Sequence, residues 1–269
     1  MIKRLYPGGK TRAFNITYDD GITQDVRFVE LLNKYGLKAT FNLNSRLMEE
    51  EFEWRHDSGL VIKRLSPEAA LQLYGDHELA SHSLTHPYMQ GMDEGALMYE
   101  MGEDKKKLQQ LFKREIAGFA LPFDYYDWRI ADCARRCGFE YSRCSEERYS
   151  YAPPEDYYWW AAGTYHVMPG FLPFVETFFH TQQELALCQI VGHSYDLDVM
   201  DMWTAMEDIL RRVSEDESVA SMTNIELVRY LKAMRAADVW EGYIRNNSAS
   251  ELWFELDGEI VSVPAHSTL

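Results

Sequence analysis

The chain of 269 residues is longer than an average domain but fits a single α/β barrel, and its 46% hydrophobic residues suffice for a large core. Its 43 acidic and 27 basic side chains give a formal charge of −16, which argues against nucleic acid or an anionic membrane as a partner. No stretch approaches the roughly 20 apolar residues of a membrane span, and the N-terminus lacks the apolar region of a secretory signal. We therefore expect a cytoplasmic protein, while its oligomeric state stays open.

The cysteines indicate no disulfide framework. The chain has four of them, Cys133, Cys137, Cys144 and Cys188, and no CxxC pair. In a long chain without a secretion signal, buried free thiols are the expected state. Cys133 and Cys137 lie one helical turn apart, but two thiols alone make a poor metal site.

The first half of the chain alternates between strand-like and helix-like segments. Apolar runs predict strands at residues 13–18, 38–44, 77–83 and 116–123. Helical spacing of apolar residues predicts helices at 25–36, 66–75 and 93–115. Ser66 before Pro67 is a typical helix start. This alternation predicts parallel strands joined by right-handed crossovers.

The second half continues the pattern and ends differently. We predict helices at 127–138, 201–214 and 224–237, and strands at 139–145 and 184–194. Residues 146–181 are aromatic and show no clear period. Residues 252–263 alternate around Asp257-Gly258, a strong signal for a type I′ hairpin. We expect residues 1–240 to form a barrel domain and 241–269 an extension packed on it, since the hairpin is too short to stand alone.

Three predicted strand ends carry unusual polar groups. Asp19, Asp20 and Gly21 follow the first strand, His82 and His86 lie in "SHSLTH", and His193 lies in "GHS". In barrels of parallel strands, chemistry takes place at the carboxyl ends of the strands. Each pattern alone has an ordinary explanation, since Asp-Asp-Gly favours a turn and an isolated HxxxH is a weak signal. Their occurrence together favours one site.

Two imidazoles and one carboxylate are a common ligand set for Zn²⁺ or another divalent first-row ion. His82 and His86 could meet on a helical turn or in a tight loop, and Pro87 favours the loop because the residue before proline avoids the helical region. A cation would also relieve the repulsion between Asp19 and Asp20. One of the two could then bind the ion, while the other acts as a general base.

The combination resembles the polysaccharide deacetylase family, also called the NodB-homology or carbohydrate esterase 4 group. The resemblance rests on "TYDDG" (17–21), "HELASHSLTHP" (77–87), "FALPF" (119–123) and "VGHSYD" (191–196), and it covers roughly residues 10–200. It implies an α/β fold, a distorted (β/α)₇ barrel, and hydrolysis of an N-acetyl group. The sequence near the C-terminus is similar to that of a subgroup of this family with a short C-terminal β extension.

The resemblance also implies roles for single residues. Asp20, His82 and His86 would hold the metal, most commonly zinc, with cobalt, nickel or manganese as alternatives. Asp19 would be the base that activates water, His193 the acid that protonates the departing amine, and the backbone N–H of Phe123 an oxyanion donor. Sugar-stacking or packing aromatics are expected in "EDYYWW" (155–160), which offers Asp156, Trp159 and Trp160 as substrate-binding candidates.

The chain departs from the family pattern in its third motif. Ala120 stands where an arginine usually orients the base, and Asp124 replaces the usual glycine. Arg129 or another cation could substitute for that arginine. Asp196 and Asp198 could orient His193 or only solvate its loop, and structural roles are favoured for His166 and His180.

Three functions therefore stay open at the level of the sequence. The first is removal of acetyl from an N-acetylated sugar or glycan precursor. The second is hydrolysis of another C–N bond, in a formyl group or a cyclic amide. The third is a weakly active relative that binds sugar, which the missing arginine favours and the retained Asp19 and His193 oppose.

Overall fold

The computed structural model describes residues 2–123, 125–240 and 242–269. A curled sheet of nine parallel strands forms its centre, in the order β10-β11-β2-β3-β6-β7-β8-β9, with β12 also pairing with β2. Among the described residues, no strand pair joins β9 to β10, so the sheet is an incomplete barrel. The strands are β2 (Arg12–Asp19), β3 (Thr40–Leu43), β6 (Glu78–Ser81), β7 (Gly118–Ala120), β8 (Tyr141–Glu147), β9 (Trp160–Ala162), β10 (Thr164–Tyr165), β11 (Ala186–Gly192) and β12 (Val219–Ser221).

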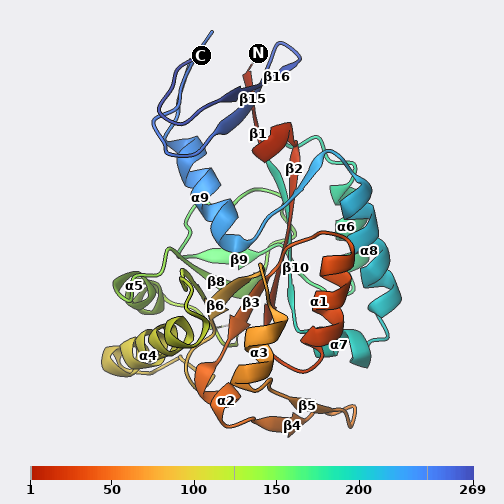
Figure 1. The fold of residues 1–269 in the computed structure, drawn as a ribbon, viewed down its shortest axis with the longest axis vertical. Helices are drawn as coiled ribbons and strands as arrows, with labels where there is room; N and C mark the ends of the chain where they lie inside the picture. The colour runs from red at the N-terminus through yellow and green to blue at the C-terminus, as the bar shows by residue number, and fades with distance from the viewer. Residues whose placement is uncertain (1, 124, 241) are drawn as a thin grey trace.

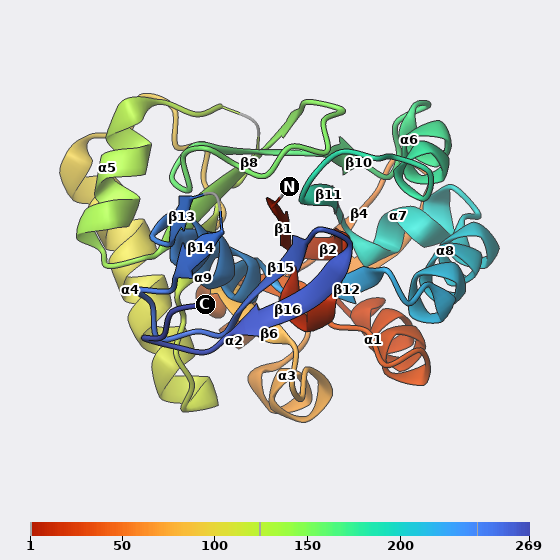
Figure 2. The same cartoon turned by 90° about the horizontal axis from the view of Figure 1, so that it is seen from above.

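Helices surround this sheet, as the view from above shows (Figure 2). They are α1 (Asp25–Lys34), α2 (Ser45–Glu49), α3 (Pro67–Leu73), α4 (Glu94–Phe112), α5 (Trp128–Arg136), α6 (Phe171–Phe178), α7 (Ser194–Val199), α8 (Trp203–Glu215) and α9 (Asn224–Arg235). The crossovers place most of them on the outer face of the sheet, where the main hydrophobic core lies. This is the expected distorted (β/α)₇ barrel.

Alternation along β2 explains why the two faces of the sheet differ. Phe14, Ile16 and Tyr18 point outwards and belong to the main core. The intervening Asn15, Thr17 and Asp19 point inwards and are buried but polar. Such groups need hydrogen-bond partners, and Asn42 on β3 donates to Thr17 Oγ1 at 2.8 Å. The interior of the barrel is therefore a polar network that leads to the carboxyl ends of the strands.

Local signals set the helix boundaries much as expected. Ser66 caps α3 by accepting a hydrogen bond from the Ala69 N–H, and Asp93 caps α4 in the same way. Thr223 and Glu226 form a reciprocal capping box at the start of α9. These side chains satisfy backbone donors that have no partner inside the helix.

Both chain ends meet in a second, smaller sheet at the top of Figure 1. The N-terminal strand β1 (Ile2–Leu5) pairs antiparallel with β15 (Leu252–Leu256), which pairs with β16 (Glu259–Val263). The predicted hairpin is confirmed, because Leu256 and Glu259 pair across Asp257 and Gly258, whose φ angles of 50° and 94° suit a type I′ turn.

This second sheet packs against the barrel. Leu252 and Phe254 share a hydrophobic core with Leu227 and Leu231 of α9 and with Leu187 of β11. A further pair, β13 (Asp238–Trp240) and β14 (Tyr243–Arg245), spans the boundary expected after residue 240, and residue 241 lies outside the described residues. The division into a barrel of residues 1–240 and a packed extension stays a prediction.

Some elements were not expected from the sequence. The aperiodic stretch 146–181 contains β9, β10 and α6, all too short or too irregular to leave a period. A two-stranded hairpin, β4 (Glu53–Arg55) and β5 (Val61–Lys63), is inserted between α2 and α3. It is joined to the loop after β2 by a bridge between Ile22 and Arg64 and lies at the bottom of Figure 1. This insertion brings side chains to the carboxyl end of β2.

The four cysteines are free thiols, three of them buried and Cys137 half-buried, as expected. None of the described helices is long and apolar enough to cross a membrane. The cytoplasmic location expected from the sequence stays a prediction.

Candidate metal centre and active site

The carboxyl ends of β2, β6 and β11 open into one cavity of about 390 Å³. Asp19, Asp20, His82, His86 and His193, predicted from three separate segments, all line it. Phe123, in the loop that follows β7, lines the same cavity. The parallel strands thus bring together the polar groups singled out in the sequence.

Asp20, His82 and His86 form a cluster whose potential ligand atoms lie within 4.8 Å of one another. Asp20 Oδ1 is 3.8 Å from His82 Nε2 and 3.6 Å from His86 Nε2. Oδ1 is buried and, besides an ion pair with Arg64, accepts no hydrogen bond from the described residues. A buried carboxylate oxygen facing two imidazole nitrogens fits the ligand preferences of a divalent first-row ion.

The two imidazoles are in the state that a metal ligand requires. His82 Nδ1 lies 2.9 Å from the carbonyl oxygen of Ala120, so it carries the proton and leaves the Nε2 lone pair towards Asp20. Burial lowers the pKa of His82 to about 3, and burial also lowers the pKa of His86. Both rings are therefore neutral near pH 7 and can donate electron pairs.

His82 and His86 lie in a loop, as Pro87 indicated, and helix α4 holds that loop. Glu100 of α4 accepts hydrogen bonds from the N–H and the hydroxyl of Thr85, at 2.9 and 2.8 Å. The Ser83 hydroxyl accepts from the His86 N–H, and His86 has a φ of 57°. A left-handed conformation is uncommon for a residue other than glycine, so these contacts fix an otherwise unfavourable turn.

Asp20 also has a left-handed backbone, with a φ of 87°. The turn directs Asp20 into the same cavity as Asp19, although neighbours on a straight strand would point to opposite faces. Arg64 donates to the Asp20 carbonyl oxygen, and its Nη1 lies 2.8 Å from Asp20 Oδ1. Burial raises the pKa of Asp20, but Arg64 and the three nearby histidines outweigh it and hold that pKa below its usual range.

Asp19 is oriented by a cation that the sequence did not reveal. Arg143 of β8 forms a buried ion pair with Asp19 Oδ1, and Asn42 donates to the same oxygen at 2.8 Å. Arg129, considered for this role, instead pairs with Asp127 at 2.8 Å. Arg143 is the neighbour of Ala120 in the register between β7 and β8, so the guanidinium comes from the adjacent strand. Asp124 lies outside the described residues.

The contact between Arg143 and Asp19 depends on the register between strands. The local pattern predicts a strand at 139–145, but it does not predict which strands pair with it or how they align. A signal was present nonetheless, because Arg143 is a charged residue in the middle of a short predicted strand. A fully buried arginine at such a position needs an acidic partner.

His193 directly follows β11, at the start of α7, and faces the cluster with its Nε2 3.8 Å from Asp20 Oδ2. Its Nδ1 lies 2.8 Å from the Tyr165 hydroxyl and 3.1 Å from Asp196 Oδ2, and Tyr165 donates to Asp196. Burial lowers the pKa of His193, but the hydrogen bond to Asp196 and the charge of Asp20 raise it to about 9. His193 is therefore a protonated acid at neutral pH.

Of the other polar residues considered near His193, the structure shows which contact its imidazole and which do not. Asp196 contacts the imidazole, whereas Asp198 accepts from Trp203 Nε1 and takes no part. His166 is buried behind Asp196, with its Nε2 3.6 Å from Asp196 Oδ2. Gly192 allows this close packing, because a Cβ there would lie 2.2 Å from the His166 ring. His180 is exposed and pairs with Glu176.

The rim of the cavity is aromatic. Phe123 stacks on Tyr88, with ring centroids 3.6 Å apart, and Tyr88 is 70% exposed. Phe52 and Trp54 come from the β4–β5 region, and Tyr195 packs edge-on against Trp54. Such exposed rings offer flat apolar surfaces beside a polar centre.

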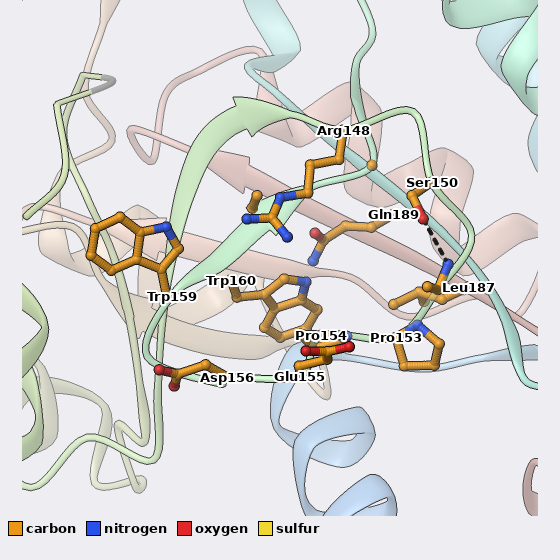
Figure 3. A pocket seen from close by; sticks show the side chains of 13 residues that line it. Arg148, Ser150, Pro153, Pro154, Glu155, Asp156, Trp159, Trp160, Leu187 and Gln189 are labelled. Atoms are coloured by element: carbon orange, nitrogen blue, oxygen red, sulfur yellow. Dashed lines mark hydrogen bonds between the residues drawn. The ribbon is translucent and has the colours of Figure 1, made fainter.

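Asp156, Trp159 and Trp160 lie elsewhere. They line a second cavity, which shares no residue with the one that holds Asp20 (Figure 3). Trp160 is buried and packs against Tyr141. Their part in substrate binding at the catalytic centre stays a prediction without a contact to support it.

This architecture and site define a deacetylase-type barrel of the NodB-homology class. The polysaccharide deacetylase family profile matches residues 8–142, half of the chain, so the chain belongs to the polysaccharide deacetylase family. A comparison with curated protein sequences finds no match.

Solved structures of this class share the fold. A protein from Mycobacterium smegmatis assigned as a polysaccharide deacetylase superposes with a TM-score of 0.63 at 13% identity, covering 87% of this chain and 94% of the other. The peptidoglycan deacetylase PdaC from Bacillus subtilis gives 0.54 at 13% identity, covering 86% and 97%. BA3943, a carbohydrate esterase 4 family pseudoenzyme from Bacillus anthracis, gives 0.51 at 14% identity, covering 84% and 68%. Active and inactive relatives thus share one barrel, and activity has to be argued from the site.

Proposed function

We propose that this chain is a metal-dependent hydrolase that removes the acetyl group from an N-acetylated sugar residue of a glycan or glycan precursor. The observation that carries the proposal is the cavity in which an Asp–His–His cluster lies between an arginine-paired carboxylate and a carboxylate-paired histidine. Family membership supports a deacetylase. The aromatic rim supports a sugar ring as the group bound beside the cluster.

Asp20, His82 and His86 would hold the metal, with zinc as the first expectation for two imidazoles and a carboxylate. A divalent ion at this place would polarise the amide carbonyl and acidify water. Arg64 keeps Asp20 ionised and fixes its carboxylate, so the ligand is ready before the ion binds.

Asp19 is assigned as the general base. Its Oδ1 is occupied by Arg143 and Asn42, which leaves Oδ2 to accept a proton from the attacking water. Oδ2 lies 4.0 Å from His82 Nε2, close to the proposed ligands. Arg143 would thus orient Asp19, the role that an arginine at position 120 usually has in this family. This assignment argues against an inactive relative.

His193 is assigned as the general acid. An amine is a poor leaving group as an anion, so C–N cleavage requires a proton on the nitrogen. Nδ1 of His193 is engaged by Tyr165 and Asp196, and Nε2 faces the cavity with the proton to transfer. The Phe123 N–H, which has no acceptor among the described residues, is assigned to the oxyanion.

Release of acetate from short oligomers of N-acetylglucosamine, with Zn²⁺ supplied, tests this function. We expect turnover by the natural chain and a loss of about 10²–10⁴-fold in Asp19→Asn, which keeps the shape of the side chain but cannot accept the proton. Metal content of Asp19→Asn should stay unchanged. An amine product without acetate, or full turnover by Asp19→Asn, would contradict the proposal.

A further inference from the structure

The second cavity shares no lining residue with the cavity that holds the metal cluster. It has a volume of about 400 Å³, within the range of small-molecule sites. It opens between β9 and the first half of β11, where Leu187 and Gln189 line it (Figure 3). Gln189 lies two residues before Val191, which lines the catalytic cavity, and four before His193, distances of about 7 and 13 Å along an extended chain. The two cavities are therefore neighbours on the same barrel that have no lining residue in common.

Gln189, one of the lining residues, carries a buried acceptor without a hydrogen-bond partner among the described residues. Its side chain is almost fully buried, and its Oε1 has no hydrogen-bond partner among the described residues. The orientation of the carboxamide follows from its neighbours. Asn15 Nδ2 donates to the carbonyl oxygen of Met222, so Asn15 Oδ1 must face Gln189 and accept from its Nε2 at 3.0 Å. The free atom is thus the carbonyl oxygen, which calls for a hydroxyl or N–H donor.

Charged groups of both signs surround the same space. The Arg148 guanidinium extends into it from the loop after β8 and pairs with no carboxylate in the part of the chain that the structure describes (Figure 3). Glu155 and Asp156 line the opposite side, and Asp156 Oδ1 accepts from the Tyr158 N–H. One cation and two carboxylates give no excess of positive charge, so an anionic ligand is not favoured. Together with Gln189 they offer donors and acceptors suited to hydroxyl groups.

Apolar surface completes the lining. Trp159 lies at the rim, 38% exposed, and its indole is held against Tyr126 with centroids 4.7 Å apart. Pro153 and Pro154 add apolar surface next to it. An aromatic ring beside planar polar side chains matches a pyranose, whose ring carbons present C–H groups on one face and hydroxyls around the edge.

We propose that this cavity binds one neutral sugar residue through Gln189, Arg148 and Trp159, at a site distinct from the metal centre. The site would hold part of a saccharide without taking part in chemistry. The proposal does not depend on the deacetylation proposed above, since none of the three residues lines the catalytic cavity.

Calorimetric titration of the full chain with maltotriose and, separately, with tri-N-acetylchitotriose tests the proposal. We expect at least one of these neutral probes to bind, and Trp159→Ala and Arg148→Ala each to weaken it by about tenfold or more. Trp240→Ala, which removes a more exposed indole from β13, should leave the affinity unchanged. Thermal unfolding of each variant confirms that it is folded, and Arg148 is exposed enough for its removal to be tolerated.

Binding should also persist in His82→Ala, which disrupts only the metal cluster. Loss of binding in His82→Ala, with full binding in Trp159→Ala and Arg148→Ala, would place the probe in the catalytic cavity and overturn the proposal. Absence of binding of both probes at millimolar concentration would overturn it as well. These titrations measure sugar binding and not deacetylase activity. A failure of the proposed deacetylation can therefore be distinguished from a failure of the proposed sugar site.

Discussion

Arg143 and Ala120 are adjacent across β7 and β8, and only the first carries a charge that reaches Asp19. The position of an arginine in the chain therefore matters less than the point in space its guanidinium occupies. A neighbouring strand supplies the same contact because side chains at paired positions project to the same face of the sheet.

We predict that Arg143→Ala lowers kcat/KM for N-acetyl sugar hydrolysis by about 10²–10³-fold, because Asp19 loses the cation that orients it. Ala120→Arg combined with Arg143→Ala should recover part of the loss, since it restores a guanidinium from the other strand. Arg129→Ala, whose partner is Asp127, is the matched control and should keep full activity. Full activity in Arg143→Ala would rule out its positioning role.

The pairing of His193 with Asp196 predicts a pH dependence. Burial lowers the pKa of His193 and the hydrogen bond to Asp196 raises it, so this carboxylate helps to keep the acid protonated, and kcat/KM should fall as pH rises through that pKa. Asp196→Asn removes the hydrogen-bonded carboxylate that raises this pKa, so the fall should begin at lower pH. One pKa unit corresponds to about 1.4 kcal/mol of lost interaction.

Asp198→Asn is the matched control for that profile, because Asp198 bonds to Trp203 and not to His193. We expect its alkaline limb to coincide with that of the natural chain. An alkaline limb of Asp196→Asn that also coincides would show that Asp196 does not set the pKa of His193.

At the scale of elements, α4 does more than cover the sheet. Glu100 holds the Thr85 backbone and hydroxyl, and Leu84 donates to the Glu100 carbonyl oxygen, so the helix fixes the loop between His82 and His86. A flexible loop would lose conformational entropy each time the metal binds, and this loss would lower the affinity for the metal.

Glu100→Ala should therefore weaken metal binding by about 10–100-fold, the usual effect of losing a group that supports a ligand. Competition with a chromophoric zinc chelator measures this affinity. Glu103→Ala, one turn along α4 and paired with Lys106 at the surface, should not change it. Equal affinities in the two variants would mean that the loop keeps its shape without α4.

The elements that could be predicted from the sequence are those whose signals are local. Caps at Ser66 and Thr223, the Asp257-Gly258 turn and the apolar run of β2 all act within a few residues. The β4–β5 hairpin and the strands β9 and β10 are too short for a period and are stabilised by contacts made elsewhere. Likewise, Asp20, His82 and His193 could be found by type and spacing, whereas Arg143 and Arg64 depend on which strands and loops become neighbours.

At the scale of the whole molecule, the sheet that joins the two chain ends shares its core with the barrel. Phe254 is fully buried among residues of α9 and β11, and the Tyr230 hydroxyl of α9 bonds to Leu5 of β1. Two elements that bury one core should unfold together.

Phe254→Ala should accordingly lower the free energy of unfolding by about 3–5 kcal/mol and leave a single transition in denaturant. Ile260→Ala on the exposed side of β16 should change it by less than about 1 kcal/mol. Two separate transitions, followed by tryptophan fluorescence and far-ultraviolet circular dichroism, would show that the C-terminal sheet is an independent unit.

The most direct test of the central claim is the metal content of the chelator-stripped protein after dialysis against limiting Zn²⁺. One ion per chain is expected in the natural protein and in His180→Ala, whose imidazole is exposed, and far less in Asp20→Ala, His82→Ala and His86→Ala. Zinc bound equally by all five proteins, or by none of them, would contradict the assignment of Asp20, His82 and His86 as a metal centre.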